Sequence, residues 1–250
     1  MAYITPVAAD WAIYRRIWRL PVAGIVPLTR KLIGNELLFG YVGDAYLFGW
    51  ARQRLPVGPD ALRHLKDAAV LSAAASNTVT IALAITAIPM AGGMGVRLPI
   101  WVIASGGALV VAPVFVALFL RKSIFCLPPR DLLFIAVAHL ARAIATPLLL
   151  ALTWHFASPE IAFRMWWLFA AFKLMLSRLP FMPNKDIVLA GAASVLFGRH
   201  ADVAVVLAMI AALFTLIHVS IGVALSLHGL GAATLNRWQT SMVSREAIPS

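Results

Sequence analysis

Long apolar segments without a single charged residue constrain this chain more than any other feature. The segment Ala68–Ala91 is uncharged throughout and, as a helix, is long enough to cross the roughly 30 Å of hydrocarbon in a bilayer. Hydrophobic residues make up 62% of the chain, well above the roughly 45–50% apolar content of soluble domains. We therefore predict an all-α, polytopic transmembrane helical bundle. Its further apolar segments are Leu98–Leu120, Leu132–Trp154, Ile161–Leu176 and Ala201–Leu227.

Two polar islands interrupt the apolar sequence, one over residues 35–44 and the other over residues 183–186. When the islands are aligned on their aspartates, Phe39 coincides with Phe181. Each island is a turn rich in helix breakers, and a short apolar segment such as Ile187–Phe197 follows it. Paired short helices of this kind form the central sites of many transporters. The pattern predicts short broken or re-entrant helices arranged as an inverted repeat.

The islands and the charges suggest three regions. Residues 1–67 hold an interfacial amphipathic helix and the first polar turn with its half-helix. Residues 68–227 form the transmembrane bundle, with the second polar turn at 179–198, and residues 228–250 form a polar C-terminal tail. In the N-terminal helix, Trp11, Tyr14 and Trp18 share one face beside several arginines, a pattern typical of helices in the headgroup layer. The alternative is that this helix is the frayed cytoplasmic end of a longer transmembrane span.

The formal net charge of +11 is concentrated in the connections between apolar segments. Lysine and arginine are frequent in residues 51–67 and 121–131, which the positive-inside rule places in the cytoplasm. Because the basic residues are spread between apolar segments, nucleic-acid binding is disfavoured. The charge pattern predicts a multi-pass protein that contacts anionic lipid.

The polar islands resemble two motifs of the flippase-like transmembrane region of lysylphosphatidylglycerol synthases and their stand-alone relatives in bacteria. The early motif corresponds to Asn35, Gly40, Gly43 and Asp44, with aspartate where the family has glutamate, and the late motif corresponds to Pro183, Asn184 and Asp186 without its glycines. The resemblance covers roughly residues 27–227. It implies a protein of the bacterial inner (plasma) membrane, either shortened at its N-terminus or starting at an internal methionine. The aminoacyl-transfer domain is absent, which argues against lipid aminoacylation.

Arg142 lies near the middle of an apolar segment, where an ionised side chain is costly unless it is paired or hydrated. His139 and Thr146 follow the same helical face. One interpretation is an anion site in which Arg142 holds a phosphate and Asp44 or Asp186 supplies the counter-charge. The alternative is a structural ion pair between helices. The two aspartates can equally be solvated loop residues.

The predicted substrate-binding set joins these residues to the other polar side chains of the islands. The full set is Asn35, Glu36, Asp44, His139, Arg142, Asn184, Lys185 and Asp186. No phosphate-cradling loop, zinc-binding pair or nucleophile motif is found, so we predict no catalytic residue, no metal and no cofactor.

The function that we expect from the sequence is binding, and translocation, of an anionic lipid or a polyprenyl-phosphate-linked glycan intermediate. Two alternatives stay open. The first is a membrane-embedded enzyme or accessory subunit of envelope lipid or glycolipid synthesis. The second is a structural subunit of a membrane complex.

Overall fold

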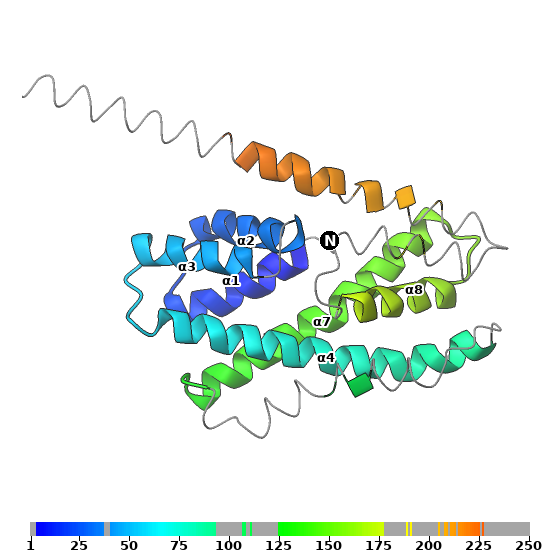
Figure 1. Cartoon of the computed structure of the whole chain (residues 1–250), viewed down its shortest axis with the longest axis horizontal. Helices are drawn as coiled ribbons and strands as arrows, with labels where there is room; N and C mark the ends of the chain where they lie inside the picture. The colour runs from blue at the N-terminus through cyan, green and yellow to red at the C-terminus, as the bar shows by residue number, and fades with distance from the viewer. Residues whose placement is uncertain are drawn as a thin grey trace, which may run out of the picture. The chain divides into compact units, whose positions relative to one another are not determined.

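The computed structural model describes residues 4–37, 41–93 and 125–177, together with short stretches and single residues between 107 and 227. The regular structure of the described residues is helical, without a strand. The named helices are α1 (Ile4–Trp18), η1 (Val22–Gly24), α2 (Ile25–Leu37), α3 (Val42–Arg54), α4 (Ala61–Gly93), α7 (Pro129–Ala157) and α8 (Phe163–Leu176), drawn in Figure 1. The chain divides into two compact units, Met1–Ala211 and Ala212–Ser250, and all seven named elements belong to the first.

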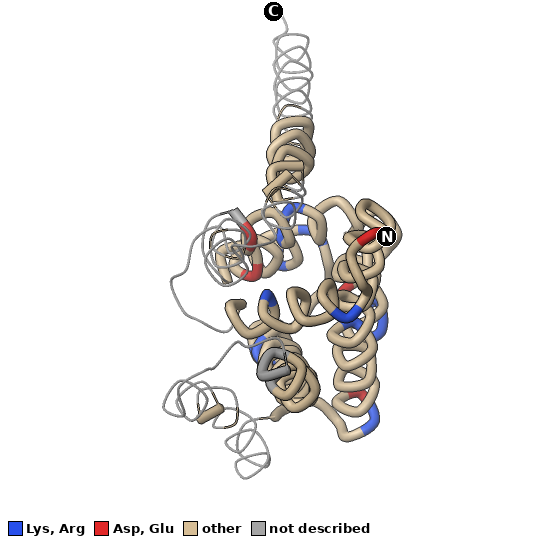
Figure 2. The backbone as a smooth tube through the Cα atoms, turned by 90° about the vertical axis from the view of Figure 1, so that its right-hand side faces the viewer, with Lys and Arg blue, Asp and Glu red and all other residues tan. Residues whose placement is uncertain are grey.

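Two of the described helices are long and apolar enough to cross a membrane. They are α4, over Ala61–Ala87, and α7, over Pro129–Ala157. The helices predicted at 68–91 and 132–154 are thus confirmed as helices of spanning length. Most of the chain in Figure 2 is uncharged, and the Lys, Arg, Asp and Glu positions interrupt it only at intervals. An inverted repeat is not shown, because the second island lies outside the described residues.

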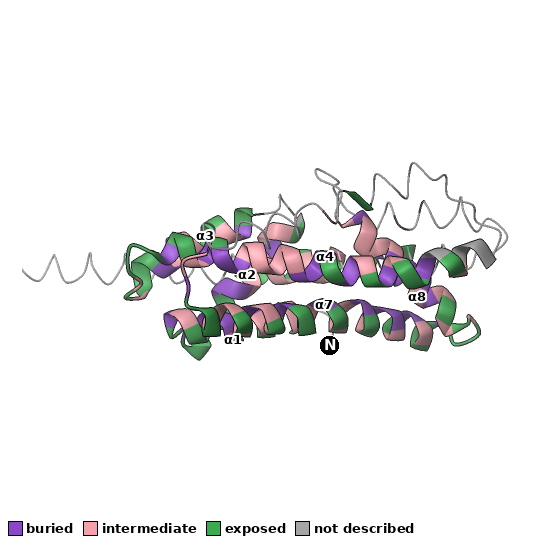
Figure 3. Cartoon of the chain, turned by 90° about the horizontal axis from the view of Figure 1, so that it is seen from below, coloured by how far each residue is buried: buried purple, intermediate pink, exposed green. Residues whose placement is uncertain are grey.

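Helix α7 has two different faces. Its buried face includes Ile135, His139, Ala143 and Pro147, at four-residue spacing. Its exposed face carries large apolar side chains, namely Leu133, Val137, Leu140, Ile144 and Leu148. Figure 3 shows these buried and exposed positions along the helix. A long exposed apolar stripe is unfavourable in water and fits contact with lipid chains.

Helices α4, α7 and α8 pack against one another through small and aliphatic side chains. Their shared core contains Val79, Leu83 and Ala87 of α4, Ala143 of α7, and Leu168 and Ala171 of α8. Pro147 lies inside α7 and is buried. Because proline has no N–H, residue 147 donates no helical hydrogen bond to the carbonyl of Ala143.

The aromatic face of α1 packs against protein, and the location of this helix in the headgroup layer stays a prediction. Tyr14 and Trp18 are almost fully buried in a core that also holds Leu28 of α2 and Leu47 of α3. Helix α1 contacts both α2 and α7. The arginines nevertheless lie beside aromatic rings, as in the contact of Arg15 with Trp11.

Helices α2 and α3 approach closely at two glycines. A Cβ atom on Gly34 would lie 3.3 Å from the Cα of Gly43, and a Cβ on Gly43 would overlap the carbonyl oxygen of Lys31. Tyr41, just before α3, has a φ of 81°, in the left-handed region that is costly for a residue with a side chain. The backbone is therefore constrained on both sides of the connection between the two helices.

A buried carboxylate joins the start of α4 to the segment before α7. The Asp67 side chain is fully buried, and its Oδ2 accepts hydrogen bonds from the backbone N–H groups of Cys126 at 2.8 Å and Leu127 at 3.0 Å. The Cys126 thiol donates to the same oxygen at 3.1 Å. Burial raises the pKa of this thiol, and the hydrogen bond to Asp67 raises it further. Asp67 therefore fixes the residues that lead into α7.

We expect Gly43→Ala to lower stability, because the added methyl group overlaps backbone that cannot move aside. Overpacking of this kind costs about 1–3 kcal/mol. Gly49→Ala, on the same helix, is the matched control, because nothing lies within 4 Å of a Cβ there. In thermal unfolding of the purified protein in detergent, Gly43→Ala should lower the midpoint and Gly49→Ala should leave it unchanged or raise it. Equal midpoints for the two variants would contradict the close approach.

We expect Asp67→Ala to speed the alkylation of Cys126, the single cysteine of the chain. Loss of the carboxylate removes both a hydrogen bond and a negative charge that disfavour the reactive thiolate. The measurement is the rate of maleimide labelling from pH 6 to 10, in which the midpoint should shift to lower pH. Asp60→Ala, which removes an exposed carboxylate at the start of the same helix, should leave the midpoint in place. An unshifted midpoint in Asp67→Ala would show that the carboxylate does not control the thiol.

Candidate functional site

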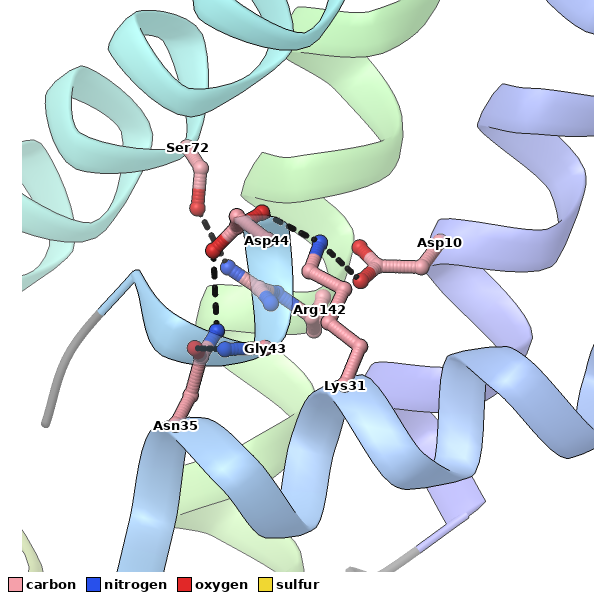
Figure 4. A network of polar contacts seen from close by, with 7 residues as sticks. All are labelled: Asp10, Lys31, Asn35, Gly43, Asp44, Ser72 and Arg142. Carbon is pink, nitrogen blue, oxygen red and sulfur yellow. Dashed lines mark hydrogen bonds and ion pairs between the residues drawn. The ribbon is translucent and has the colours of Figure 1, made fainter. Parts of the chain in front are cut away.

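Lys31 lies between two carboxylates in the interior of the first unit. Its Nζ is 2.7 Å from Oδ2 of Asp10 and 3.1 Å from Oδ1 of Asp44. Only 12% of the Lys31 side chain is exposed, with 10% for Asp10 and 16% for Asp44. Figure 4 shows the lysine reaching from α2 toward α1 on one side and α3 on the other. One ammonium thus holds three helices together.

Asn35 connects the same aspartate to the backbone of α3. Its Nδ2 donates to Oδ2 of Asp44 at 2.9 Å, and its Oδ1 accepts from the N–H of Gly43 at 2.8 Å. Gly43 and Asp44 belong to the first turn of α3, where backbone N–H groups lack helical partners. Asn35 therefore caps α3 from the neighbouring helix and fixes the orientation of the Asp44 carboxylate.

Arg142 enters this region from α7. Its Nη2 donates to Oγ of Ser72 on α4 at 2.7 Å, as Figure 4 shows, and its positive charge acts on Asp10. Thr146, predicted on the same face, donates instead to the carbonyl of Arg142 at 2.8 Å. The charged groups of four helices, with Ser72 of a fifth, thus form one polar cluster, which we call the Lys31 cluster. It comprises Asp10, Lys31, Asn35, Asp44, Ser72 and Arg142.

His139 lies next to the Lys31 cluster, one turn before Arg142 on α7. It is 3% exposed, and both ring nitrogens are buried without a hydrogen bond to the described residues. The backbone of Ala68 is close enough to the ring to favour its positively charged form. Arg142, Asp10 and Lys31 are close enough to act on the ring electrostatically. His139 is therefore a buried polar group in a charged neighbourhood.

The charges of the Lys31 cluster support one another. Burial by itself raises the pKa of Asp10, but the nearby Lys31 and Arg142 outweigh it and hold the pKa below its usual value. Burial lowers the pKa of Lys31, and Asp10, Tyr14 and Asp44 reverse this and raise it above its usual value. Both groups of the Asp10–Lys31 pair are thus charged at neutral pH. Lys31 and Arg142 carry cationic groups and Asp10 and Asp44 carry carboxylates, so the formal charges of the cluster cancel.

The structure brings together four of the eight residues predicted from sequence. Asn35, Asp44 and Arg142 belong to the Lys31 cluster and His139 adjoins it, whereas Glu36 is exposed and lies outside it. The interpretation of Asp44 as a solvated loop residue is wrong, because Asp44 is a partly buried member of α3. The remaining three, Asn184, Lys185 and Asp186, lie outside the described residues, so their convergence with Arg142 stays a prediction.

Asp10 and Lys31 are members of the cluster that the sequence reasoning missed. The spacing of Lys31 and Asn35, four residues apart on one helical face, is a signal that could have identified the lysine. No comparable signal marks Asp10, because its partner lies on another helix. Ser72 of α4 joins the cluster through its hydrogen bond with Arg142 of α7.

The cluster offers anion-binding groups and no recognisable metal site. The described residues contain no group of three or more His, Cys, Asp or Glu side chains placed to hold a metal ion. Arg142 presents five N–H donors, and within the described part of the chain its guanidinium donates one side-chain hydrogen bond. Its remaining donors suit the oxygens of a phosphate or carboxylate.

We expect Lys31→Met to be strongly destabilising, because it leaves the carboxylates of Asp10 and Asp44 without the cation that bridges them. Breaking a buried ion pair from one side costs about 3–5 kcal/mol. Adding Asp10→Asn should recover part of the loss, because one of the repelling charges is then removed. Thermal unfolding in detergent measures both effects. Arg63→Met removes the cation of an exposed pair with Asp60 and should cost less than about 1 kcal/mol. An Asp10→Asn change that gave no recovery would contradict the bridging role of Lys31.

No protein-family model matches the chain, and neither a curated protein nor a solved structure with significant similarity to it is found. The resemblance to the flippase-like region of lysylphosphatidylglycerol synthases therefore stays a prediction. Function has to be argued from the buried charges and the apolar helices that surround them.

Proposed function

We propose that this chain is a multi-pass protein of a bacterial inner membrane that binds an anionic lipid or a lipid-linked glycan intermediate and moves it between leaflets. The single observation that carries the proposal is the position of Arg142. It lies in a helix of spanning length, and its guanidinium donates one side-chain hydrogen bond to the described residues. The ligand class follows from what such a group can bind.

An arginine in an apolar helix has a high desolvation cost, of which the Ser72 hydroxyl offsets little and the charge of the nearby Asp10 offsets a further part. Guanidinium groups in such positions commonly face a water-filled cavity or a charged ligand. The planar fork of donors matches two oxygens of a phosphate, which is the charged group of a phospholipid or a polyprenyl phosphate. Arg142 therefore supports a phosphate-binding role.

Lys31 gives the site a second cation, and the two carboxylates beside it act as counter-ions before a phosphate binds. Asp10 and Asp44 balance Lys31 and the neighbouring Arg142, so the buried charges cancel. An incoming phosphate competes with the carboxylates for the two cations. Binding then changes the contacts between α1, α2, α3 and α7, which is the kind of rearrangement that alternating access requires.

The apolar surfaces support a location in the membrane. Helices α4 and α7 are of spanning length, and α7 exposes a continuous apolar stripe. The apolar segments predicted at 98–120 and 201–227 add further spans, and the basic connections fit a cytoplasmic side. The resemblance of the polar islands to the flippase-like family agrees with this arrangement.

We expect Arg142→Gln to weaken binding of a phosphate-bearing lipid by about 10- to 100-fold, because a charge-assisted hydrogen bond contributes about 1.5–3 kcal/mol. The measurement uses purified protein in vesicles that contain fluorescent phosphatidylglycerol or a polyprenyl phosphate, with binding and movement between leaflets followed separately. Arg142→Lys, which keeps the charge but loses the fork, should have an intermediate effect.

Arg130→Gln is the matched control, because Arg130 begins the same helix and is exposed. It should bind and move lipid like the wild-type protein. If Arg142→Gln and Arg142→Lys both retain wild-type binding, the phosphate role of Arg142 is wrong. A chemically altered lipid among the products would instead favour the membrane-embedded enzyme.

A further inference from the structure

A monoanionic headgroup bound at Arg142 would upset the charge balance of the Lys31 cluster. Asp10 and Asp44 already cancel Lys31 and Arg142. One further negative charge in an apolar interior is costly unless a positive charge accompanies it. The compensating charge can come from a group close to Arg142 that is neutral before the anion binds.

His139 is the group that fits this role. It is 3% exposed, and neither ring nitrogen has a hydrogen-bond partner among the described residues. It lies three residues before Arg142 on α7, so both side chains leave the same face of the helix. A phosphate oxygen between the two side chains would give His139 its missing partner, and a protonated ring donates from both nitrogens.

We propose that His139 binds a proton together with the anionic headgroup, so that the protein takes up phosphodiester and proton as a pair. This inference rests on the proposed function, since it assigns to the same site a second ligand. In the paired state the headgroup carries one negative charge and His139 one positive charge. The buried charges then cancel again, as they do before binding.

The charged and polar groups around His139 determine how readily its ring takes up a proton. Arg142 on its own helix and Lys31 on α2 oppose a positive ring, whereas Asp10 on α1 favours it. Asp44 on α3 is bound to Lys31 and Asn35. Helix α4 presents Ala68, and the neighbouring Asp67 is bound to the amides before α7. The charged residues of α8 are Arg164 and Lys173.

Burial opposes a positive ring most strongly, and the two cations add to this opposition. A headgroup that neutralises Arg142 removes the part that comes from Arg142, and it adds a negative charge of its own beside the ring. Binding of the anion and binding of the proton thus favour each other. By linkage, the same coupling must appear in both directions, as tighter lipid binding at lower pH and as proton uptake on lipid binding.

The test measures binding of fluorescent phosphatidylglycerol to the full chain in nanodiscs of neutral lipid between pH 5.5 and 8.5. A phosphodiester keeps its single charge over this range, so any pH dependence belongs to the protein. We expect affinity to rise by about tenfold for each unit of falling pH where one proton is taken up per lipid. Calorimetry in two buffers of different ionisation enthalpy counts the protons in the wild-type protein, without any substitution.

His139→Gln should bind lipid with little pH dependence and without proton uptake, because the amide cannot take the proton. The matched control is His155→Gln, a histidine near the end of the same helix whose Nδ1 lies 3.3 Å from the carbonyl of Ile161. It should keep the wild-type slope and the wild-type proton count. The thermal midpoints of both variants show whether they are folded.

The possible outcomes separate the inference from the function on which it rests. Wild-type binding that is independent of pH, or that takes up no proton, overturns the proton site and leaves lipid binding standing. If His139→Gln keeps the wild-type coupling between lipid binding and proton uptake, another group takes up the proton. This outcome also overturns the proposed proton site. If phosphatidylglycerol and a polyprenyl phosphate both fail to bind at every pH, the proposed function fails and the proton site fails with it.

Discussion

The ammonium of Lys31 between Asp10 and Asp44 is the interaction on which the rest of this structure depends. Lysine has three N–H donors and a flexible stem, so one side chain on α2 can reach carboxylates on both α1 and α3. The pairing is possible only because Gly43 allows the two backbones of α2 and α3 to approach at Lys31 itself. The close contact at Gly43 and the buried charge triad of Asp10, Lys31 and Asp44 therefore specify the same helix arrangement.

The same triad explains why polar residues occur inside a bundle that is otherwise apolar. A lone carboxylate in such an interior would become neutral or force the helix outward. Asp10 and Asp44 avoid this because a shared cation, an asparagine and a nearby arginine satisfy them. The arrangement fixes the charges at one depth of the bundle, next to the buried face of α7.

The long helices could be predicted from sequence because their signal is local. An uncharged segment of spanning length needs no knowledge of its neighbours, and α4 and α7 include the predicted ranges 68–91 and 132–154. The protein cover over the aromatic face of α1 could not be predicted, for the opposite reason. Lipid and a protein core both favour apolar side chains, so the sequence of α1 cannot distinguish the headgroup layer from the cover that α2 and α3 provide.

The residues of the candidate site also fall into two groups: some have a signal in the local sequence, and others are identified only by the packing of distant segments. Asn35, Asp44, His139 and Arg142 could be selected because each is a polar residue in an unusual sequence setting. Their partners could not, because Asp10 and Lys31 are separated by 21 residues and Ser72 and Arg142 by 70. An acidic residue in an amphipathic helix and a basic residue near a proline are ordinary in sequence, and only the packing of α1 on α2 makes them a buried pair.

Pro147 gives α7 a mechanical property that a regular helix lacks. The carbonyl of Ala143 receives no hydrogen bond from residue 147, so the helix lacks one of its regular hydrogen bonds just after Arg142. The half that begins at Pro129 is held by α1, through the Arg16–Asp131 ion pair, and the half that ends at Ala157 packs against α8, where Trp154 lies beside Trp166. Any small bend between these two anchored halves therefore falls next to the guanidinium of Arg142.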